Sequence, residues 1–111
     1  MNIIYHQGLT RERWQAFSLL EQMANIGSEV GRACKRKQEN NQEATEAAMF
    51  RAVELFDLTR QDGKNRARLK EVARSREVFL DFLVGGNVYQ SSRESLEQYF
   101  TQFALAARQG R

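Results

Sequence analysis

The sequence is poor in residues that break helices and in residues that carry most enzyme chemistry. It contains no proline, one tryptophan, one histidine (His6) and one cysteine (Cys34). Without proline no helix is interrupted by a proline ring, which favours a nearly all-α chain. One cysteine cannot form an internal disulfide, and the position of Cys34 on an apolar helical stripe predicts a small core residue rather than a nucleophile.

The single histidine leaves little material for a catalytic or metal site. His6 lies near the N-terminus, so we predict no Ser–His pair, no histidine general base and no His-containing metal site. The sequence also lacks a glycine-rich phosphate loop after a strand and the Glu-x-x-His pairs of di-iron bundles. We therefore predict a protein that is not an enzyme and that has no catalytic residues, cofactor or metal.

Membrane and export segments are not evident either. No apolar run approaches the roughly 18 to 20 residues that cross a bilayer. The N-terminal residues show neither a basic region nor a cleavage site, so we expect no signal peptide. With the lone cysteine, these features predict a cytoplasmic protein without membrane contact.

What the sequence does contain is helical periodicity in four segments joined by short polar links. We expect helices over 10–37, 42–60 and 64–84, and a fourth that opens at Ser91 or Ser92 and ends near Gly110. Short links favour antiparallel neighbours. We thus predict one all-α domain over 1–111, an antiparallel up-down-up-down four-helix bundle. An N-terminal arm over 1–9 either packs on the bundle or is disordered.

Two local patterns predict helix starts. Thr10 is a suitable N-cap for the first helix. Ser91 with Glu94 fits a capping box for the fourth.

The first helix carries two neighbouring apolar stripes, one bulky and one that narrows at Gly27 and Gly31. We expect this helix to be the centre of the bundle. A glycine inside a helix costs roughly 0.8 to 1 kcal/mol relative to alanine, so the pair needs a compensating contact. We interpret it as the close approach of the second or fourth helix. The alternative is a flat face that docks another subunit or a ligand.

Arg76 interrupts the apolar stripe of the third helix. A buried guanidinium without a carboxylate partner is very costly. Counting residues from the helix ends places Arg76 near the height of Glu21 and Glu97. We predict a structural ion pair between Arg76 and Glu21 that fixes the helix register, with Glu97 as the second candidate.

Positive charge gathers at one end of the predicted bundle. The net charge of +3 is only weak evidence for a nucleic-acid partner, but alternating helix directions place eight cations at one end. They are Arg11, Arg13, Arg60, Lys64, Arg66, Arg68, Arg108 and Arg111. Three of them, Lys64, Arg66 and Arg68, would oppose the macrodipole at a helix N-terminus. We hypothesise that this end binds the phosphates of RNA or DNA.

Bulky apolar residues exceed what one inward face per helix requires. The surplus consists of Phe50, Leu58, Val78 and Phe82. Surplus apolar surface on a small bundle is typical of self-association. We therefore predict that these four residues line the interface of a homo-oligomer.

Several segments resemble a group of small uncharacterised prokaryotic proteins. They are Trp14-x-x-Phe17-Ser18-Leu19, the run from Glu21 to Ala33, Arg51-Ala52-x-Glu54-Leu55-x-Asp57-Leu58-Thr59 and Arg74-x-Arg76-Glu77-Val78. More distantly, the order of helices is similar to that of the four-helix proteins encoded by intervening sequences in 23S ribosomal RNA genes. It is also similar to that of the accessory variability determinant of diversity-generating retroelements. Asn25-Ile26-Gly27-Ser28-Glu29 resembles the Asn-Ile-Ala-Glu-Gly segment of the intervening-sequence family. The resemblance implies bundles that assemble as pentamers and, for the retroelement protein, binding to nucleic acid and a reverse transcriptase.

The charge, the apolar surplus and the resemblance lead to one functional prediction. The protein is a non-enzymatic, oligomeric helical-bundle adaptor whose basic end contacts nucleic acid, together with a protein partner. The alternative is a purely structural or protein-binding module whose charges serve solubility alone.

Overall fold

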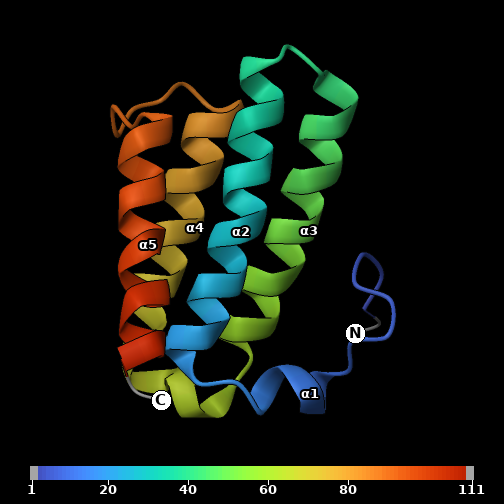
Figure 1. Ribbon diagram of the computed structural model, residues 1–111, viewed down its shortest axis with the longest axis vertical. Helices are drawn as coiled ribbons and strands as arrows, with labels where there is room; N and C mark the ends of the chain where they lie inside the picture. Colours follow the sequence, from blue (N-terminus) through green and yellow to red (C-terminus); the bar gives the residue numbers. More distant parts are fainter. Residues whose placement is uncertain (1–2, 110–111) are drawn as a thin grey trace.

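The computed structural model describes residues 3–109, and all regular structure in that range is helical (Figure 1). The elements are α1 (Arg11–Gln15), α2 (Leu19–Gln38), α3 (Gln42–Arg60), the 3₁₀-helix η1 (Gly63–Arg68), α4 (Leu69–Val84) and α5 (Arg93–Gln109). The all-α prediction is confirmed. None of the described helices is both long enough and apolar enough to cross a membrane.

The segment expected as one helix over 10–37 consists of two helices. Thr10 caps α1 as predicted, because its hydroxyl accepts a hydrogen bond from the Arg13 amide at 3.1 Å. The chain leaves helical geometry at residues 16–18, and Ser18 then begins α2 with a capping box. The Ser18 hydroxyl accepts from the Glu21 amide at 3.1 Å, and the Glu21 carboxylate accepts from the Ser18 amide at 3.0 Å. This reciprocal capping fixes a new start, and α1 turns aside below the long helices (Figure 1).

Two other helix starts differ from the prediction. α4 begins at Leu69 rather than at residue 64, because the Asp62 carboxylate accepts the Lys64 amide at 3.2 Å and starts η1 first. α5 begins after Ser92, whose hydroxyl accepts from the Ser95 amide at 3.0 Å. The structure thus selects Ser92, and the expected capping box of Ser91 with Glu94 is wrong.

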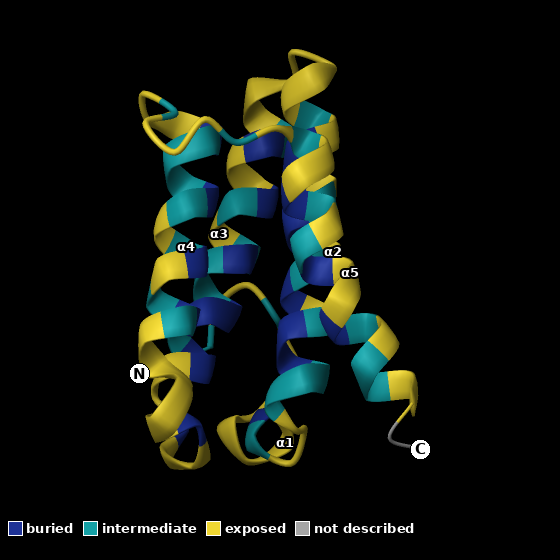
Figure 2. Ribbon diagram, turned by 90° about the vertical axis from the view of Figure 1, so that its left-hand side faces the viewer, coloured by how far each residue is buried: buried dark blue, intermediate teal, exposed yellow. Residues whose placement is uncertain are grey.

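α2 is the central element of the four long helices, as the sequence predicted. It packs along α3 and along α5, whereas α4 packs mainly on α3, and the backbones of α4 and α5 lie apart (Figure 2). Figure 2 shows the buried positions on the inward sides of these helices. Phe56 of α3 lies at their centre, with its ring 6.1 Å from that of Phe79 and 6.3 Å from that of Phe100.

Cys34 is part of this core and is 1% exposed. Burial is the main cause that raises the pKa of its thiol to about 11. The thiol is therefore not ionised near neutral pH, as expected for a core residue.

Gly27 marks the closest approach of α5 to α2. A Cβ atom added at Gly27 would lie 2.7 Å from Cβ of Phe100, whereas one added at Gly31 would meet no atom within 4 Å. The expected close contact with the fourth predicted helix is therefore present at Gly27. At Gly31 it is absent from the described structure.

The N-terminal arm packs on α3 over its described residues. Glu54 accepts hydrogen bonds from the backbone amides of Ile4, Tyr5 and His6, at distances of 2.7 to 3.1 Å. The Tyr5 ring stacks on that of Phe50, with centroids 5.7 Å apart. The arm and α1 thus cover one side of α3.

Burial contradicts the prediction that Leu58 lines a subunit interface. Leu58 follows Glu54 by one helical turn, on the same side of α3, and only 2% of it is exposed. It belongs to the core, so it cannot line a subunit interface. Phe50 stays 42% exposed, and Val78 and Phe82 are partly buried against the core.

Candidate nucleic-acid interface

The cations predicted to contact nucleic acid lie in elements that meet at one end of the molecule, called the basic end below. It comprises α1, η1 and the last turns of α3 and α5, at the bottom of Figure 1. The cations are Arg11 and Arg13 in α1, Arg60 in α3, Lys64, Arg66 and Arg68 in η1, and Arg108 in α5. Arg111, also expected here, lies outside the described residues.

Arg60 and Arg68 are paired with nearby carboxylates. Both oxygens of Glu71 accept from Nη2 of Arg68, at 2.8 and 2.9 Å. Nη1 of Arg60 lies 3.5 Å from Oδ1 of Asp57. These two cations are therefore partly neutralised before any ligand arrives.

Lys64 connects η1 to the end of α1. Its ammonium group donates to the Gln15 carbonyl at 2.9 Å and contacts the Asp62 carboxylate. Because α4 begins only at Leu69, Lys64 and the arginines that follow it lie in η1 and not in the first turn of an α-helix. Of the three, only Arg68 keeps the expected place at an α-helix N-terminus, as the N-cap residue of α4.

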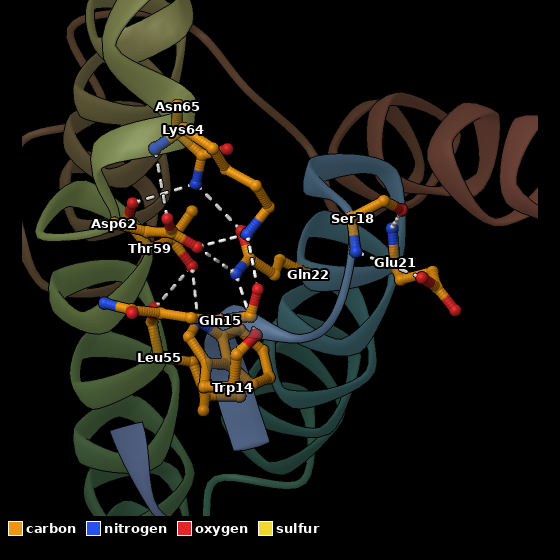
Figure 3. A network of polar contacts seen from close by, with 10 residues as sticks. All are labelled: Trp14, Gln15, Ser18, Glu21, Gln22, Leu55, Thr59, Asp62, Lys64 and Asn65. Carbon is orange, nitrogen blue, oxygen red and sulfur yellow. Dashed lines mark hydrogen bonds and ion pairs between the residues drawn. The ribbon is translucent and has the colours of Figure 1, made fainter. Parts of the chain in front are cut away.

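Gln22 is the centre of a buried hydrogen-bond network that joins α1, α2, α3 and η1 (Figure 3). Its side-chain amide donates to the Trp14 carbonyl at 2.9 Å and to the Asp62 carboxylate at 3.0 Å. Its Oε1 accepts from Nδ2 of Asn65 at 2.8 Å, and that Nδ2 also donates to the Thr59 carbonyl at 3.0 Å. Both polar atoms of the buried Gln22 side chain are satisfied, as a stable buried network requires.

Trp14 anchors α1 to α3 within the same network. Its indole Nε1 donates to the Thr59 hydroxyl at 3.1 Å, and that hydroxyl donates to the Leu55 carbonyl at 2.8 Å. Trp14 and Thr59 are 3% and 0% exposed. α1 is therefore held by a buried side chain, although it is short.

Asp62 supplies the negative charge of the network. Burial alone would raise the pKa of Asp62, but hydrogen bonds from Lys64 and Gln22 outweigh it and hold the pKa below its usual value. The carboxylate is thus ionised at neutral pH and stabilises the Lys64 ammonium. Because the network fixes α1 and η1, it also fixes the segments that carry Arg11 and Arg66.

Arg11, Arg66 and Arg108 are the unpaired cations predicted for this end. All three are exposed, and none forms an ion pair within the part of the chain that the structure describes. The Arg13 guanidinium also has no ion pair among the described residues and donates to the Gly8 carbonyl at 3.1 Å. The basic end therefore presents guanidinium groups that are open to an anionic ligand.

The sequence interpretation missed Lys70 and Gln22. Lys70 lies in the first turn of α4, is exposed, and has no ion pair among residues 3–109. Lys70 follows Arg66 by four residues, and this spacing was the sequence signal that the two cations are neighbours on a helical surface. Gln22 lies three residues after Leu19 and four before Ile26, so its position already placed a polar side chain on the inward face.

Arg76 has a different partner from the one predicted. Its Nε lies 3.2 Å from Oδ1 of Asp57 on α3, and the two side chains are 30% and 28% exposed. Glu21 is instead a capping residue at the start of α2, and Glu97 pairs with Arg93 at 2.7 Å. The predicted Arg76–Glu21 pair is wrong because α4 packs mainly on α3.

A second polar cluster lies where the arm meets α2 and α3. Nδ1 of His6 lies 3.0 Å from Glu54, and its Nε2 lies 3.6 Å from Glu29. Glu29 also pairs with Arg32 at 3.0 Å and with Arg51 at 3.1 Å. In the described range no group of three or more His, Cys, Asp or Glu side chains is placed to hold a metal ion.

A groove lies between α4 and α5. It encloses about 420 Å³, and its apolar lining includes Val78, Leu96, Phe100 and Phe103. Tyr99 also lines it, and burial is the main cause that raises the pKa of Tyr99 to about 12. The phenol is therefore neutral at physiological pH.

The arrangement described so far is a charged surface on a rigid support. Comparison with protein-family models, curated proteins and solved structures finds no match. The function must therefore be argued from the geometry of the basic end and of the groove.

Proposed function

We propose that the protein is a non-enzymatic adaptor in which an antiparallel up-down-up-down four-helix bundle presents its basic end to the phosphates of RNA or DNA. The observation that carries this proposal is the set of exposed, unpaired guanidinium groups of Arg11, Arg66 and Arg108. Guanidinium groups bind phosphate in bidentate geometry and are weakly hydrated. The distant relationship to the intervening-sequence and accessory variability determinant proteins is part of this proposal, as are a cytoplasmic location and a protein partner.

The buried network supports the proposal because it makes the basic end stiff. Binding that orders flexible side chains or segments costs free energy. Gln22, Trp14 and Asn65 hold α1 and η1 before any ligand arrives, so only the arginine side chains need to be ordered. The small number of free cations argues for weak binding with a shallow dependence on salt, because the salt slope grows with the number of phosphates contacted.

The test is the salt dependence of binding to labelled RNA and DNA, measured by fluorescence anisotropy. Each neutralised phosphate contributes about −0.9 to the slope of log affinity against log salt on a duplex. Three contacts thus give a slope near −3. Replacing Arg11, Arg66 and Arg108 by Gln should remove about that much of the slope and weaken binding at low salt.

A control variant also removes three positive charges, but from the C-terminal part of α2, away from the basic end. It replaces Arg32, Lys35 and Arg36 by Gln and should keep the wild-type slope. Equal losses in both variants would mean that net charge alone attracts the nucleic acid. No binding at low salt would exclude the nucleic-acid function.

A second candidate function is self-association through the groove between α4 and α5. The specific observation is that Val78, predicted as an interface residue, lines this apolar groove. Phe50 and Phe82 remain candidates for the same role. Light scattering tests this: an oligomer of the 12.9 kDa chain that Val78→Glu converts to a folded monomer would support it. A wild-type monomer at high concentration would contradict it.

A further inference from the structure

A hollow lies beside the basic end, between the start of α2 and the end of α5. It encloses about 450 Å³. Ala24 of α2 and Ala104 and Ala107 of α5 line its walls, so no long apolar side chain fills it. Its edge is formed by Phe17, in the link between α1 and α2.

The Phe17 ring is exposed but firmly supported. It is 37% exposed. The buried Trp14 ring packs against it edge-on, with centroids 5.8 Å apart and planes at 73°. The Phe17 amide also donates to the Trp14 carbonyl at 3.1 Å. Phe17 therefore offers an aromatic surface from a fixed position.

Polar and cationic groups surround the same hollow. Asn25 donates through Nδ2 to the Glu21 carbonyl at 2.9 Å, which leaves its Oδ1 directed to other donors. The Ser28 hydroxyl lies on the same side of α2, one turn from Ala24. Arg108, one of the unpaired cations, and Glu21, whose carboxylate caps the Ser18 amide, complete the lining. An aromatic platform, hydrogen-bonding groups and a cation within one hollow form the combination that binds an unstacked nucleotide.

From this we infer that the nucleic acid is single-stranded and that one of its bases enters this hollow and packs against Phe17, while Arg108 contacts a neighbouring phosphate. The inference rests on the proposed function of the basic end. Bases within a duplex are paired and stacked, so they cannot reach the ring. A single strand can turn one base out onto it without breaking pairs.

The test compares a short labelled single strand with a duplex of the same sequence in low-salt anisotropy titrations. The main variant is Phe17→Leu, which keeps an apolar contact with Trp14 and removes the aromatic face. Tyr89→Leu is the control, because Tyr89 is a similarly exposed aromatic residue in the link between α4 and α5, outside both proposed interfaces. Circular dichroism melts check that both variants are folded, and Phe17→Trp tests whether another aromatic side chain restores binding.

We expect the wild type to prefer the single strand and Phe17→Leu to weaken that binding about 5- to 100-fold, the range for loss of one stacked base. Duplex binding and the salt slope should not change, Tyr89→Leu should bind as the wild type does, and Phe17→Trp should restore affinity. Wild-type single-strand affinity in Phe17→Leu would overturn the inference. If the Arg11, Arg66 and Arg108 variant still lost binding in that case, the basic-end function would stand alone. Absence of any binding would refute both.

Discussion

The two glycines of α2 allow a matched test of how closely α5 packs on it. Gly27→Ala and Gly31→Ala make the same change, four residues apart in one helix. At Gly31 the new methyl group meets no atom within 4 Å, so only helix propensity changes. Alanine is more favourable than glycine by about 0.8 to 1 kcal/mol inside a helix, so Gly31→Ala should stabilise the protein by about that amount.

At Gly27 the same gain is opposed by a clash. The new Cβ would lie 2.7 Å from Cβ and 3.2 Å from Cγ of Phe100. Cβ is fixed to the backbone, so rotation of Phe100 cannot relieve the contact, and α5 must move. Overpacking of this kind costs typically about 1 to 3 kcal/mol. Gly27→Ala should therefore lie about 1 to 3 kcal/mol below Gly31→Ala in free energy of unfolding.

Urea denaturation followed by circular dichroism measures this difference, and thermal melts should show it as several degrees in Tm. The m-value should stay constant, so that midpoints compare directly. Equal stabilisation by the two substitutions would refute the tight packing of α5 on Gly27. A loss of stability in Gly31→Ala would mean that a neighbour, such as another subunit, occupies that site.

Three further predictions concern the polar groups. Asn65→Ala leaves the acceptors of Gln22 and Thr59 without this donor, so urea denaturation should show a loss of about 1 to 3 kcal/mol. Burial alone would raise the pKa of Glu54, but hydrogen bonds from His6 and the arm amides hold it below its usual value. Glu54 thus stabilises the folded state fully above its unfolded pKa of about 4.3. This stabilisation is lost as the pH falls through the lower pKa of the folded state. The wild type should therefore have a higher Tm than Glu54→Gln near neutral pH, and this difference should vanish in acid. Lys70→Gln should reduce the magnitude of the slope of log affinity against log salt by up to about 0.9. An unchanged slope would exclude Lys70 from the interface.

The helical fold followed from periodicity, but helix boundaries depended on competing local patterns. The bounds predicted for the second helix, 42–60, are those of α3. The break at residues 16–18 was missed because apolar spacing continues across it. Ser18 and Glu21 nevertheless form the Ser-x-x-Glu pattern of a capping box. A capping signal inside a long periodic segment can therefore outweigh the periodicity.

The sequence predicted which cations gather at the basic end, but it did not predict which of them remain without an ion pair. Helix order alone grouped the cations at one end. Which of them are neutralised depends on local geometry, such as the turn at Asp62 that captures Lys64. The partner of Arg76 depended on which helix α4 packs against, and short links do not determine that. Likewise no helical pattern indicates that Leu58 is buried or that the arm docks on Glu54.

The groove between α4 and α5 has a consequence for the order in which parts of the protein unfold locally. α2 joins α3 and α5 along their lengths, so these three helices share one closely packed unit. α4 depends mainly on α3, and its other side borders the groove. Elements with fewer buried contacts open at lower free energy in hydrogen exchange. We expect the amides of α4 to exchange before those of α2, and folding to proceed by docking α4 last onto a preformed three-helix unit.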